Sequence, residues 1–562
     1  MWRAVPERRR GADRQPIRSN GASPSVAEAV QHGHVLRRGL DIFNFFDGSP
    51  ERTRRMLDLG LLPWWTFPGV RVAFWRPVSA LTHWLDYTLW RDLPVLMHVQ
   101  TLLWFSALIV AAFLMYRRLM GPADGAGLAA LLYALAGAHA DAITNVAGRN
   151  VILGVFFGTL TLLLHDRWRG AGWRAGSVAA PACLALALLS AEGGVATGAY
   201  LLAHAVFLDR GGWRRRLQGL LPHGTVIATW QLLYSGLGYG VLGAAPAYIN
   251  PIREPLEFAY ALAKNGPILL AAQWTGPSAE SFSTLPSPAA AIRWVAALVT
   301  IAVLVALLAP LLKRDPVARF WALGQALAVV PICAAMPHDR YLFFVGLGAM
   351  GLLAQFLCGL LSRESCRPGR LLWRVPAILL ACALAGIHLI ASPLQLIRSA
   401  AGMGGVGVTE QAADSIPADP ALRRQLLVIV NLPTAVVVFH EFFVRTVKGQ
   451  PIPAQTRLLA SGAAALRAYR VDAHTLRVRW EGRQEPIFRA REHPLVAGQR
   501  VRLAGTDVEV TAVTGDGWPA EAIFRFDDDL DGPALRWLTW EKDQGRFVSF
   551  RPPSVGETVL VR

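Results

Sequence analysis

The first apolar segment of spanning length reads LMHVQTLLWFSALIVAAFLMY over residues 96–116, and Arg117 and Arg118 follow it directly. A helix needs about 20 mainly apolar residues to cross the hydrocarbon core of a bilayer. Similar segments lie at 125–144, 151–165, 177–190, 194–208, 222–245, 291–312, 318–335, 341–361 and 372–391. The sequence therefore predicts an α-helical polytopic membrane protein with about ten transmembrane helices.

The composition also points to contact with lipid. Of the 562 residues, 53% are hydrophobic and only 17% are charged, which gives more apolar surface than one soluble core can bury. The net charge of +17 is spread over short loops, whereas a nucleic-acid-binding protein gathers its charge on one soluble face. We therefore expect membrane lipid as a partner, and no nucleic acid. The cysteines lie in or beside apolar segments, so no disulfide framework is predicted.

Basic residues are concentrated in every second loop. These loops carry Arg117 and Arg118; Arg167, Arg169 and Arg174; Arg210 and Arg214 to Arg216; Lys313, Arg314 and Arg319; and Arg363, Arg367, Arg370 and Arg374. Because short loops rich in Lys and Arg remain in the cytoplasm, this set is predicted to be cytoplasmic. Residues 40–95 and the C-terminal part are then predicted to be extracytoplasmic.

Residues 1–39 are polar and rich in arginine, and they contain no apolar core for a signal peptide or a membrane helix. The predicted topology nevertheless places this segment outside. Two explanations remain open: the protein exports a disordered basic tail, or an earlier membrane helix precedes Met1. The second explanation would add one helix to the count.

Residues 40–95 are predicted to form helices on the outer membrane surface. Ser49 with Pro50 is typical of a helix start, and Gly60 is typical of a helix end. In VSALTHWLDYTLW (78–90), polar residues occupy one helical face and leucines another. The tryptophans of this region are predicted to form an aromatic belt at the membrane interface: Trp64, Trp65, Trp75, Trp84 and Trp90.

One further segment, 257–274, is only half apolar. Its run is interrupted by Lys264, Asn265, Gly266 and Pro267. A broken backbone exposed to lipid would leave amides without hydrogen bonds, so we expect an interfacial or re-entrant segment here.

The C-terminal part has the period of β-structure. Apolar and polar residues alternate between Gly, Pro and Asp turns at 466–471, 475–480, 501–505, 508–513, 522–526, 535–540, 547–551 and 558–561. Residues 454–562 are therefore predicted to form a small antiparallel β-sandwich or barrel. Residues 393–453 are expected to connect it to the bundle, with a strand, a turn and a helix in LLVIVNLPTAVVVFHEFFV (426–444). Alternatively, 426–444 spans the membrane and the β domain is cytoplasmic.

Ionisable residues at the predicted outer helix ends are the candidates for function, because a charge near the bilayer core is costly. They include Asp41, Asp47, Arg76, His83, Asp86, Arg149, Glu192, His338 and Arg340. Each also has a structural interpretation. Arg76 and Glu192 could cap helices, and Arg149 could anchor a helix at the membrane surface.

Sequence motifs of common soluble sites are absent. There is no GxxxxGK[ST] phosphate loop, no HExxH and no paired CxxC, so we expect neither a cofactor nor a bound metal. Asp527, Asp529 and Asp531 resemble the start of a calcium loop, but Leu538 stands where the bidentate Glu is required. An acidic turn is the preferred interpretation.

Four stretches, taken in order, resemble the GT-C superfamily of polytopic glycosyltransferases, in particular its protein O-mannosyltransferase and tetratricopeptide-bearing branches. They are FWRPVSALTHWLDYTLWRDLPVLMHVQTLLW (74–104), AGRNVILGVFFGTLTLLLHD (147–166), LALLSAEGGV (186–195) and HDRYLFFVGLG (338–348). The resemblance covers about 40–392. With LLPWW (61–65) before the Arg-Pro pair, it is similar to a set of bacterial membrane proteins, which implies the bacterial inner membrane as the location.

The resemblance implies a transferase that uses a polyprenyl-phosphate-linked sugar at the outer face of the membrane. Asp41 or Asp47 would be the catalytic base in the first outer loop, and Arg76, Arg149 and Arg340 would meet the phosphate. The remaining substrate-binding candidates are His83, Asp86, Glu192 and His338. Ala191 departs from the family pattern, which has a lysine in this turn. The alternative is a non-catalytic protein that binds or transports a lipid-linked glycan.

Overall fold

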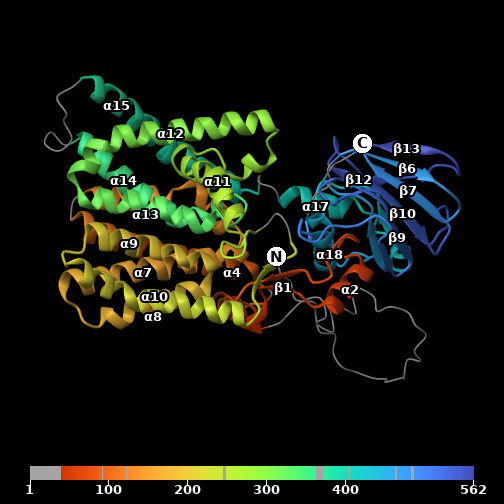
Figure 1. The fold of residues 1–562 in the computed structure, drawn as a ribbon, viewed down its shortest axis with the longest axis horizontal. Coiled ribbons are helices and arrows are strands. Elements are labelled where there is room, and N and C mark those ends of the chain that lie inside the picture. Colours follow the sequence, from red (N-terminus) through yellow and green to blue (C-terminus); the bar gives the residue numbers. More distant parts are fainter. Residues whose placement is uncertain are drawn as a thin grey trace.

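The computed structural model describes residues 39–91, 93–121, 124–244, 248–361, 371–402, 406–462, 465–482 and 487–562. A bundle of helices and a β-rich C-terminal domain lie next to each other along the longest axis of the molecule (Figure 1). The predicted fold class, a helical membrane bundle with a C-terminal β-rich domain, is confirmed. The predicted N-terminal segment falls almost entirely outside the described residues.

The bundle is built from helices that match the predicted apolar segments. They are α4 (Pro94–Met120), α5 (Asp124–Ala134), α7 (Arg149–Ala171), α8 (Gly176–Ser190), α9 (Thr197–Phe207), α10 (Trp213–Gly236), α12 (Ser287–Arg314), α13 (Pro316–Ile332), α14 (Phe343–Leu361) and α15 (Leu371–Gly386). Five helices of the described residues are long and apolar enough to cross a membrane, or six if the bent segment Gly125–Thr144 counts as one. The predicted count of about ten therefore stays a prediction.

The segment predicted to be broken at Pro267 is a continuous helix, α11 (Pro255–Thr275). Its middle packs against the bundle, where Ile268 and Leu269 are buried. A Cβ on Gly266 would lie within 4 Å of side chains of α13, so the glycine allows the two helices to approach closely. Packing against neighbouring helices explains why proline is tolerated here.

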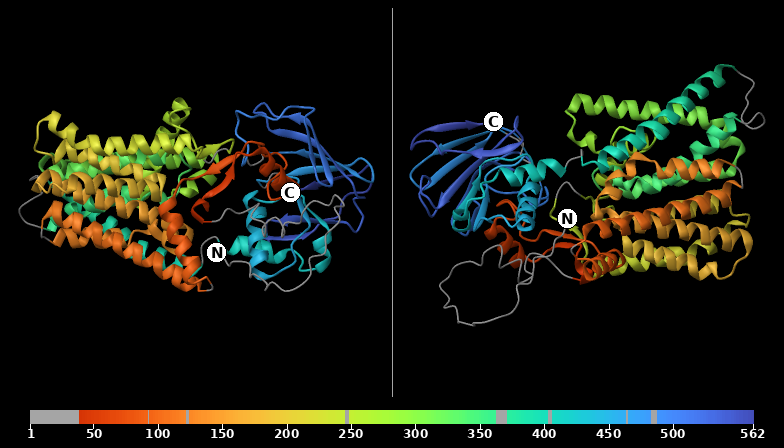
Figure 2. Two further views of the ribbon diagram at one scale, coloured as in Figure 1. Left: turned by 90° about the horizontal axis from the view of Figure 1, so that it is seen from below. Right: turned by 180° about the vertical axis from the view of Figure 1, so that it is seen from behind.

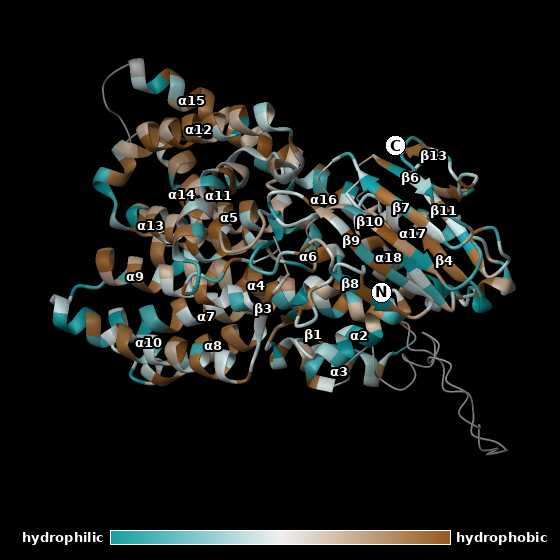
Figure 3. Cartoon of the chain, turned by 45° about the vertical axis from the view of Figure 1, so that its right-hand side comes forward, coloured by the Kyte–Doolittle hydropathy of each residue, from teal (hydrophilic) through white to brown (hydrophobic). Residues whose placement is uncertain are grey.

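The two ends of the bundle differ in their sequence. The basic turns after α4, α7, α9 and α12 lie at the end away from the C-terminal domain, which we call the far end (Figure 2). The other end, next to the β-rich domain, is the domain-side end. The helices between them are mostly hydrophobic in Figure 3.

The C-terminal domain contains two sheets. The antiparallel six-stranded sheet has the order β13-β6-β7-β10-β9-β8, with β6 (Leu466–Arg470), β7 (Thr475–Trp480), β8 (Arg500–Leu503), β9 (Thr506–Val513), β10 (Pro519–Phe526) and β13 (Thr558–Val561). The four-stranded sheet has the order β12-β11-β4-β5, with β4 (Leu426–Ile429), β5 (Gln455–Leu458), β11 (Leu535–Glu541) and β12 (Arg546–Ser549). All eight strands predicted after residue 465 are present.

The segment 426–444 forms strand β4 and most of helix α18 (Val436–Lys448), as the favoured interpretation predicted. β4 lies between β5 and β11 and is parallel to both, so β4, α18 and β5 form a parallel crossover unit. The alternative that 426–444 spans the membrane is therefore wrong. Strands from both sides of the predicted boundary at residue 454 share this sheet.

The segment before α3 packs into the C-terminal domain. Helix α2 (Pro50–Leu59) has Ser49 as its N-cap and Gly60 as its C-cap, as predicted. The indole rings of Trp64 and Trp65 are 3% and 1% exposed, and Trp64 stacks on Trp480 of β7. The predicted membrane belt is wrong for these two residues, because their apolar partner is the core of the β domain.

Two buried arginines fasten this contact by donating to main-chain carbonyls. Arg457 donates to the carbonyls of Leu57 and Asp58 at 3.3 and 2.9 Å. Arg489 donates to the carbonyls of Trp65 and Thr66. The first loop and the C-terminal domain therefore lie on the same side of the bundle.

Helix α3 (Pro77–Leu89) has its polar face turned inwards. Ser79, Thr82 and Asp86 are buried, whereas Leu81 and Trp84 are 46% and 48% exposed. The predicted division of this helix into two faces is confirmed. Since the apolar face is the exposed one, it is the face that would contact lipid.

Candidate functional site

Arg76 and Glu192 form an ion pair at the domain-side end. Arg76 precedes α3, and Glu192 begins the short helix η4 (Glu192–Ala196) after α8. Nε and one Nη of Arg76 donate to the same Glu192 oxygen, at 2.8 and 2.6 Å. Both side chains remain accessible, at 18% and 17% exposure. The structure thus brings two predicted site residues together, and the Arg76 side chain makes no cap to its helix.

Aromatic rings pack against this ion pair. The Arg76 guanidinium carbon lies 4.3 Å from the ring centroid of Phe74 and 5.2 Å from that of Phe43. Tyr234 of α10 places its hydroxyl 3.5 Å from the second Glu192 oxygen. These contacts hold the guanidinium in one orientation and partly shield it from solvent.

Asp41 lies next to the same aromatic cluster. It ends the short helix η1 (Gly39–Asp41), which contacts α3. Its carboxylate accepts hydrogen bonds from the Tyr239 hydroxyl at 3.3 Å and from the Asn44 amide at 3.2 Å. The rings of Tyr239 and Tyr234 have centroids 5.9 Å apart, which connects Asp41 to the ion pair.

Asp47 has a local structural role. It ends strand β1 (Asn44–Asp47), which pairs with β2 (Arg71–Ala73) beside the C-terminal domain. Its carboxylate accepts from the Ser49 amide at 3.0 Å and lies 3.6 Å from the Arg52 guanidinium. These contacts fix the turn into α2. Of the two predicted catalytic acids, only Asp41 lies with the polar side chains around Arg76.

A second group of charges surrounds the loop between α13 and α14. Nδ1 of His338 lies 2.8 Å from Glu280, and Nε2 lies 4.0 Å from Asp141. The hydrogen bond with His338 lowers the pKa of Glu280, so this carboxyl is ionised. Arg340 donates to the Tyr341 hydroxyl at 3.1 Å. Within the described residues, no carboxylate lies within ion-pair distance of Arg340.

Tyr248 lies between the two groups. Its backbone pairs with Ala335 in an isolated antiparallel bridge, and its side chain is 40% exposed. It interacts electrostatically with Arg76, Glu192 and Tyr341. Desolvation by neighbouring side chains and the nearby Glu192 carboxylate raise its pKa to about 12, so the hydroxyl stays protonated. We call the set Arg76, Glu192, Tyr248, Tyr341, Arg340 and His338 the polar band.

The other predicted arginine, Arg149, is completely buried. One Nη lies 2.6 Å from Asp86, and the other donates to the Met97 carbonyl at 2.6 Å. Nε donates to Thr101 at 3.0 Å. With 0% and 1% exposure of the Arg149 and Asp86 side chains, this ion pair joins α3, α4 and α7 and does not face a ligand.

His83 lies near this buried pair. Its side chain is 4.0 Å from Asp86 and packs against the ring of Phe43. Burial and the Arg149 charge lower its pKa to about 3, so the imidazole is neutral. His83 and Asp86 are therefore buried on the inner face of α3 and are not solvated.

Several residues in the polar band or next to it were not predicted as site residues. Glu280, Tyr234, Tyr239 and Tyr248 come from loops or helix ends far apart in sequence. A single polar residue in a loop carries no periodicity, so sequence patterns offered no signal for them. Tyr341 had a weak signal, because it follows Arg340 directly in the family-like stretch HDRYLFFVGLG.

The calcium-like run in the C-terminal domain is an acidic turn. Asp529 and Asp531 lie 3.3 and 2.6 Å from the guanidinium of Arg470. Both carboxylates therefore pair with an arginine of β6. The preferred interpretation of this run is confirmed.

No protein-family model matches the chain, and no curated protein matches it. Among solved structures, it is similar to ArnT from Cupriavidus metallidurans bound to undecaprenyl phosphate, with 18% identity, 77% of this chain and 88% of that chain covered, and a TM-score of 0.33. It is also similar to the Archaeoglobus fulgidus oligosaccharyltransferase in the apo form, with 14% identity, 75% and 62% coverage, and a TM-score of 0.38. At such low identities and TM-scores, these matches assign neither a site residue nor a substrate to this chain.

Proposed function

We propose that the polar band binds a polyprenyl-phosphate-linked sugar and that the protein transfers the sugar to an acceptor at the outer face of the bacterial inner membrane. The observation that carries the proposal is the position of Arg340. It is a partly accessible cation without a carboxylate partner in the described chain, at the end of an apolar helical bundle. A lipid with an anionic head group needs these two environments next to each other.

The arrangement suits both halves of such a substrate. The apolar outer surfaces of the bundle and of α3 are available to a polyprenyl chain, with Leu81, Trp84 and Leu89 exposed on α3. The phosphate would lie at the helix ends, where Arg340 and the hydroxyls of Tyr248 and Tyr341 can donate to it. Arg76 is committed to Glu192, so its part is to position the aromatic side chains around the site.

The proposed reaction requires one base and one charged contact. An acceptor hydroxyl attacks the anomeric carbon of the sugar, and its proton passes to a carboxylate, for which Asp41 is the candidate. The bond between the anomeric carbon and the phosphate oxygen breaks, and polyprenyl phosphate leaves with the electron pair. Arg340 stabilises the negative charge that develops on the departing phosphate.

One backbone contact with the C-terminal domain supports a role of this domain near the proposed site. The Ala490 amide donates at 3.1 Å to the carbonyl of Gly243, which directly follows strand β3 (Gly240–Leu242). This contact brings the loop 487–493 of the domain to the edge of the polar band. We propose that the domain is extracytoplasmic and guides the acceptor.

The test is sugar transfer by the purified full chain in lipid vesicles, from a radiolabelled polyprenyl-phosphate sugar. Arg340→Ala should lower the rate about 100- to 1000-fold, the usual cost of removing one donor to a developing charge. Asp41→Asn should lower it about 100-fold or more. Arg253→Ala is the matched control, because Arg253 is an exposed arginine on the same side of the bundle.

An unchanged rate in Arg340→Ala would exclude the proposed role of the polar band. Donor lipid retained by the intact protein without any transfer would instead support the alternative, a non-catalytic protein that binds a lipid-linked glycan. Photocrosslinking with a polyprenyl-phosphate probe measures that binding independently of turnover.

A further inference from the structure

Three buried histidines from three different helices meet near the far end of the bundle. His165 of α7, His204 of α9 and His223 of α10 are 2%, 3% and 2% exposed. The ring centroid of His165 lies 4.9 Å from those of His204 and His223. We call these residues the histidine cluster. They are far apart in sequence, which is why no metal motif was visible there.

Several nitrogens of this cluster have no partner. Nδ1 of His165 and Nδ1 of His204 are buried without a hydrogen bond to any described residue. Both ring nitrogens of His223 are buried as well, and the backbone group that one of them faces is the Gly219 carbonyl of its own helix, which leaves the other nitrogen with a free lone pair. Edge-to-face packing explains the ring orientations, but it leaves these polar atoms unsatisfied, which costs free energy. A bound species that accepts nitrogen lone pairs would remove that cost.

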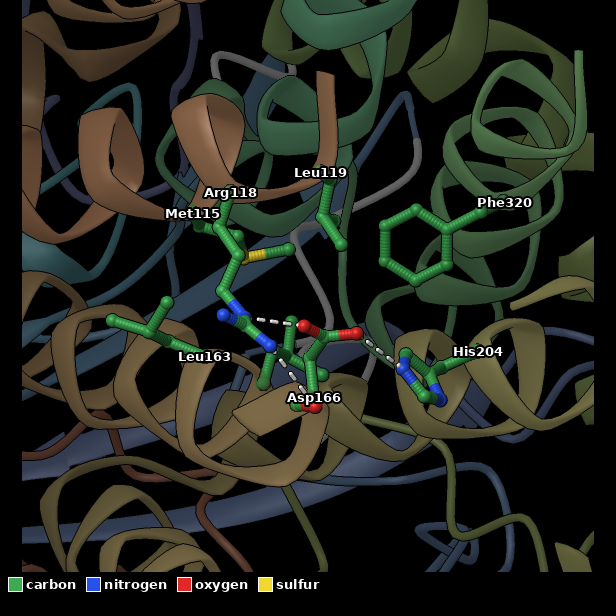
Figure 4. A pocket seen from close by; sticks show the side chains of 8 residues that line it. Met115, Arg118, Leu119, Leu163, Asp166, His204 and Phe320 are labelled. Atoms are coloured by element: carbon green, nitrogen blue, oxygen red, sulfur yellow. Dashed lines mark hydrogen bonds and ion pairs between the residues drawn. The ribbon is translucent and has the colours of Figure 1, made fainter. Parts of the chain in front are cut away.

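The neighbouring carboxylate prepares one of these histidines as a metal ligand. Nε2 of His204 lies 2.9 Å from one oxygen of Asp166, and the Arg118 guanidinium holds the other oxygen (Figure 4). A proton on Nε2 donates to the carboxylate, which leaves the Nδ1 lone pair of His204 free. A carboxylate bound to the far nitrogen of an imidazole is the usual second-shell support of a metal-binding histidine.

We propose that the histidine cluster binds one transition-metal ion of the Zn²⁺ type through the imidazoles of His165, His204 and His223. Neutral imidazole suits Zn²⁺, Co²⁺, Ni²⁺ and Cu²⁺, whereas Mg²⁺ and Ca²⁺ prefer oxygen ligands. The ion would link α7, α9 and α10 near the far end. This proposal is independent of the function proposed for the polar band.

Binding requires a small rearrangement of the rings. In the described chain, the ligand atoms that already lie within 4.8 Å of one another belong to a different group, the carboxylates of Glu254, Glu257 and Glu492. The nitrogens of the histidine cluster therefore have to rotate towards a common centre. Rotation about χ2 is soft for histidine. His204 keeps its orientation through Asp166, so His165 and His223 are the rings that rotate.

The experiment measures metal binding by the full chain in detergent, purified with a tag that contains no histidine. After treatment with a chelator, the protein is dialysed against Zn²⁺ or Co²⁺, and the bound metal is counted by mass spectrometry. We expect one equivalent of metal, visible absorption of Co²⁺ in a nitrogen-rich site, and a higher melting temperature with Zn²⁺.

Variants distinguish metal binding at the histidine cluster from unspecific metal binding. His223→Gln and His204→Gln should lose the stoichiometric metal, and Asp166→Asn should weaken binding about 10- to 100-fold. The matched control is His139→Gln, because His139 is also buried with both nitrogens unpartnered but packs among Tyr133, Phe105 and Phe343. It should bind metal like the unchanged protein.

Less than one equivalent of metal on the unchanged, folded protein would overturn the proposal and favour packed neutral rings or buried water. If His223→Gln binds as much metal as the unchanged protein, the metal lies outside the histidine cluster, for example at the carboxylates of Glu254, Glu257 and Glu492. The melting temperature of each variant without metal shows whether it has folded. If a histidine variant does not fold, the metal affinity of Asp166→Asn, which keeps all three imidazoles, tests the proposal instead.

Discussion

The two ends of the bundle use arginine differently. At the far end, Arg118 pairs with Asp166 and Arg169 pairs with Asp209, so these guanidinium groups meet carboxylates within the bundle. At the domain-side end, Arg340 has no such partner in the described chain, although Asp141 and Glu280 lie nearby and are 39% and 47% exposed. The domain-side end also contains two paired arginines, Arg76 with Glu192 and Arg149 with Asp86, so Arg340 is the arginine of the polar band that is available to a ligand.

The charged side chains at the domain-side end also differ in how deeply they are buried. Arg149 and Asp86 are fully buried, whereas Arg76, Glu192 and Arg340 are partly exposed. A buried pair has already lost its water, so it cannot gain by binding a ligand unless the pair breaks. This difference in burial assigns a structural role to the pair of Arg149 and Asp86 and leaves the partly exposed charges for ligand contacts.

The largest effect is expected from breaking the buried pair. Arg149→Leu leaves Asp86 charged and unpaired between α3, α4 and α7, and it should lower the free energy of unfolding by about 3–5 kcal/mol. Denaturant unfolding in detergent measures it. The double variant Arg149→Leu with Asp86→Leu should recover much of the loss, since no lone charge remains. A loss below about 1 kcal/mol in the single variant would show that the pair is not the structural anchor inferred here.

A smaller effect is expected where the first loop meets the C-terminal domain. Gly60 has a φ of +77°, and a Cβ there would lie 1.7 Å from the Thr456 carbonyl oxygen. Gly60→Ala should therefore cost more than the about 1–2 kcal/mol of a left-handed alanine alone. Gly449→Ala is the control, because Gly449 has a φ of +65° with no atom within 4 Å of its Cβ.

The readout for Gly60→Ala is limited proteolysis of residues 40–73 together with thermal unfolding. Cleavage should rise in Gly60→Ala and remain unchanged in Gly449→Ala. Equal effects of the two variants would mean that the close approach to Thr456 does not hold the loop to the domain.

Local sequence signals predicted the local structure well. Ser49, Pro50 and Gly60 predicted α2, and the alternation of apolar residues predicted the strands, because each signal depends on neighbours in the chain. Trp64 and Trp65 were placed wrongly, since an aromatic residue suits a membrane interface as well as a protein core. The contact that decides between them is with Trp480, about 400 residues away, and no short-range pattern encodes it.

The candidate site was predictable only in part. Arg76, Glu192, His338 and Arg340 were identified because charged residues are rare near apolar helices. Which of them pair was not predictable, because Arg76 and Glu192 are separated by more than a hundred residues and pair only through the fold. The same limitation hid the pairing of Arg149 with Asp86, which turns two predicted ligand contacts into a buried support.

Glu441, a buried carboxyl of the C-terminal domain, allows the structural role of buried groups to be tested through the pH dependence of stability. Burial raises the pKa of Glu441 in α18 from 4.5 to about 8, against the effect of Arg445. The folded protein therefore keeps a proton that the unfolded chain loses above about pH 4.5, so stability should fall as the pH rises from 4.5 to 8. Glu441→Gln should flatten this part of the pH profile of the melting temperature. An unchanged slope would mean that other groups set it.

The smallest effect is expected for the Arg118 and Asp166 pair at the far end, and it completes the comparison with Arg149. Their side chains are 30% and 17% exposed, so solvent replaces much of the lost attraction. Arg118→Ala should cost only about 0–1 kcal/mol of the free energy of unfolding, measured under the same conditions as Arg149→Leu. His204 keeps its contact with Asp166 in this variant, because it binds the other carboxylate oxygen. If Arg118→Ala costs as much as Arg149→Leu, then solvent exposure does not determine how much these two ion pairs contribute to stability. Pairing alone would then decide how strongly an arginine stabilises this bundle.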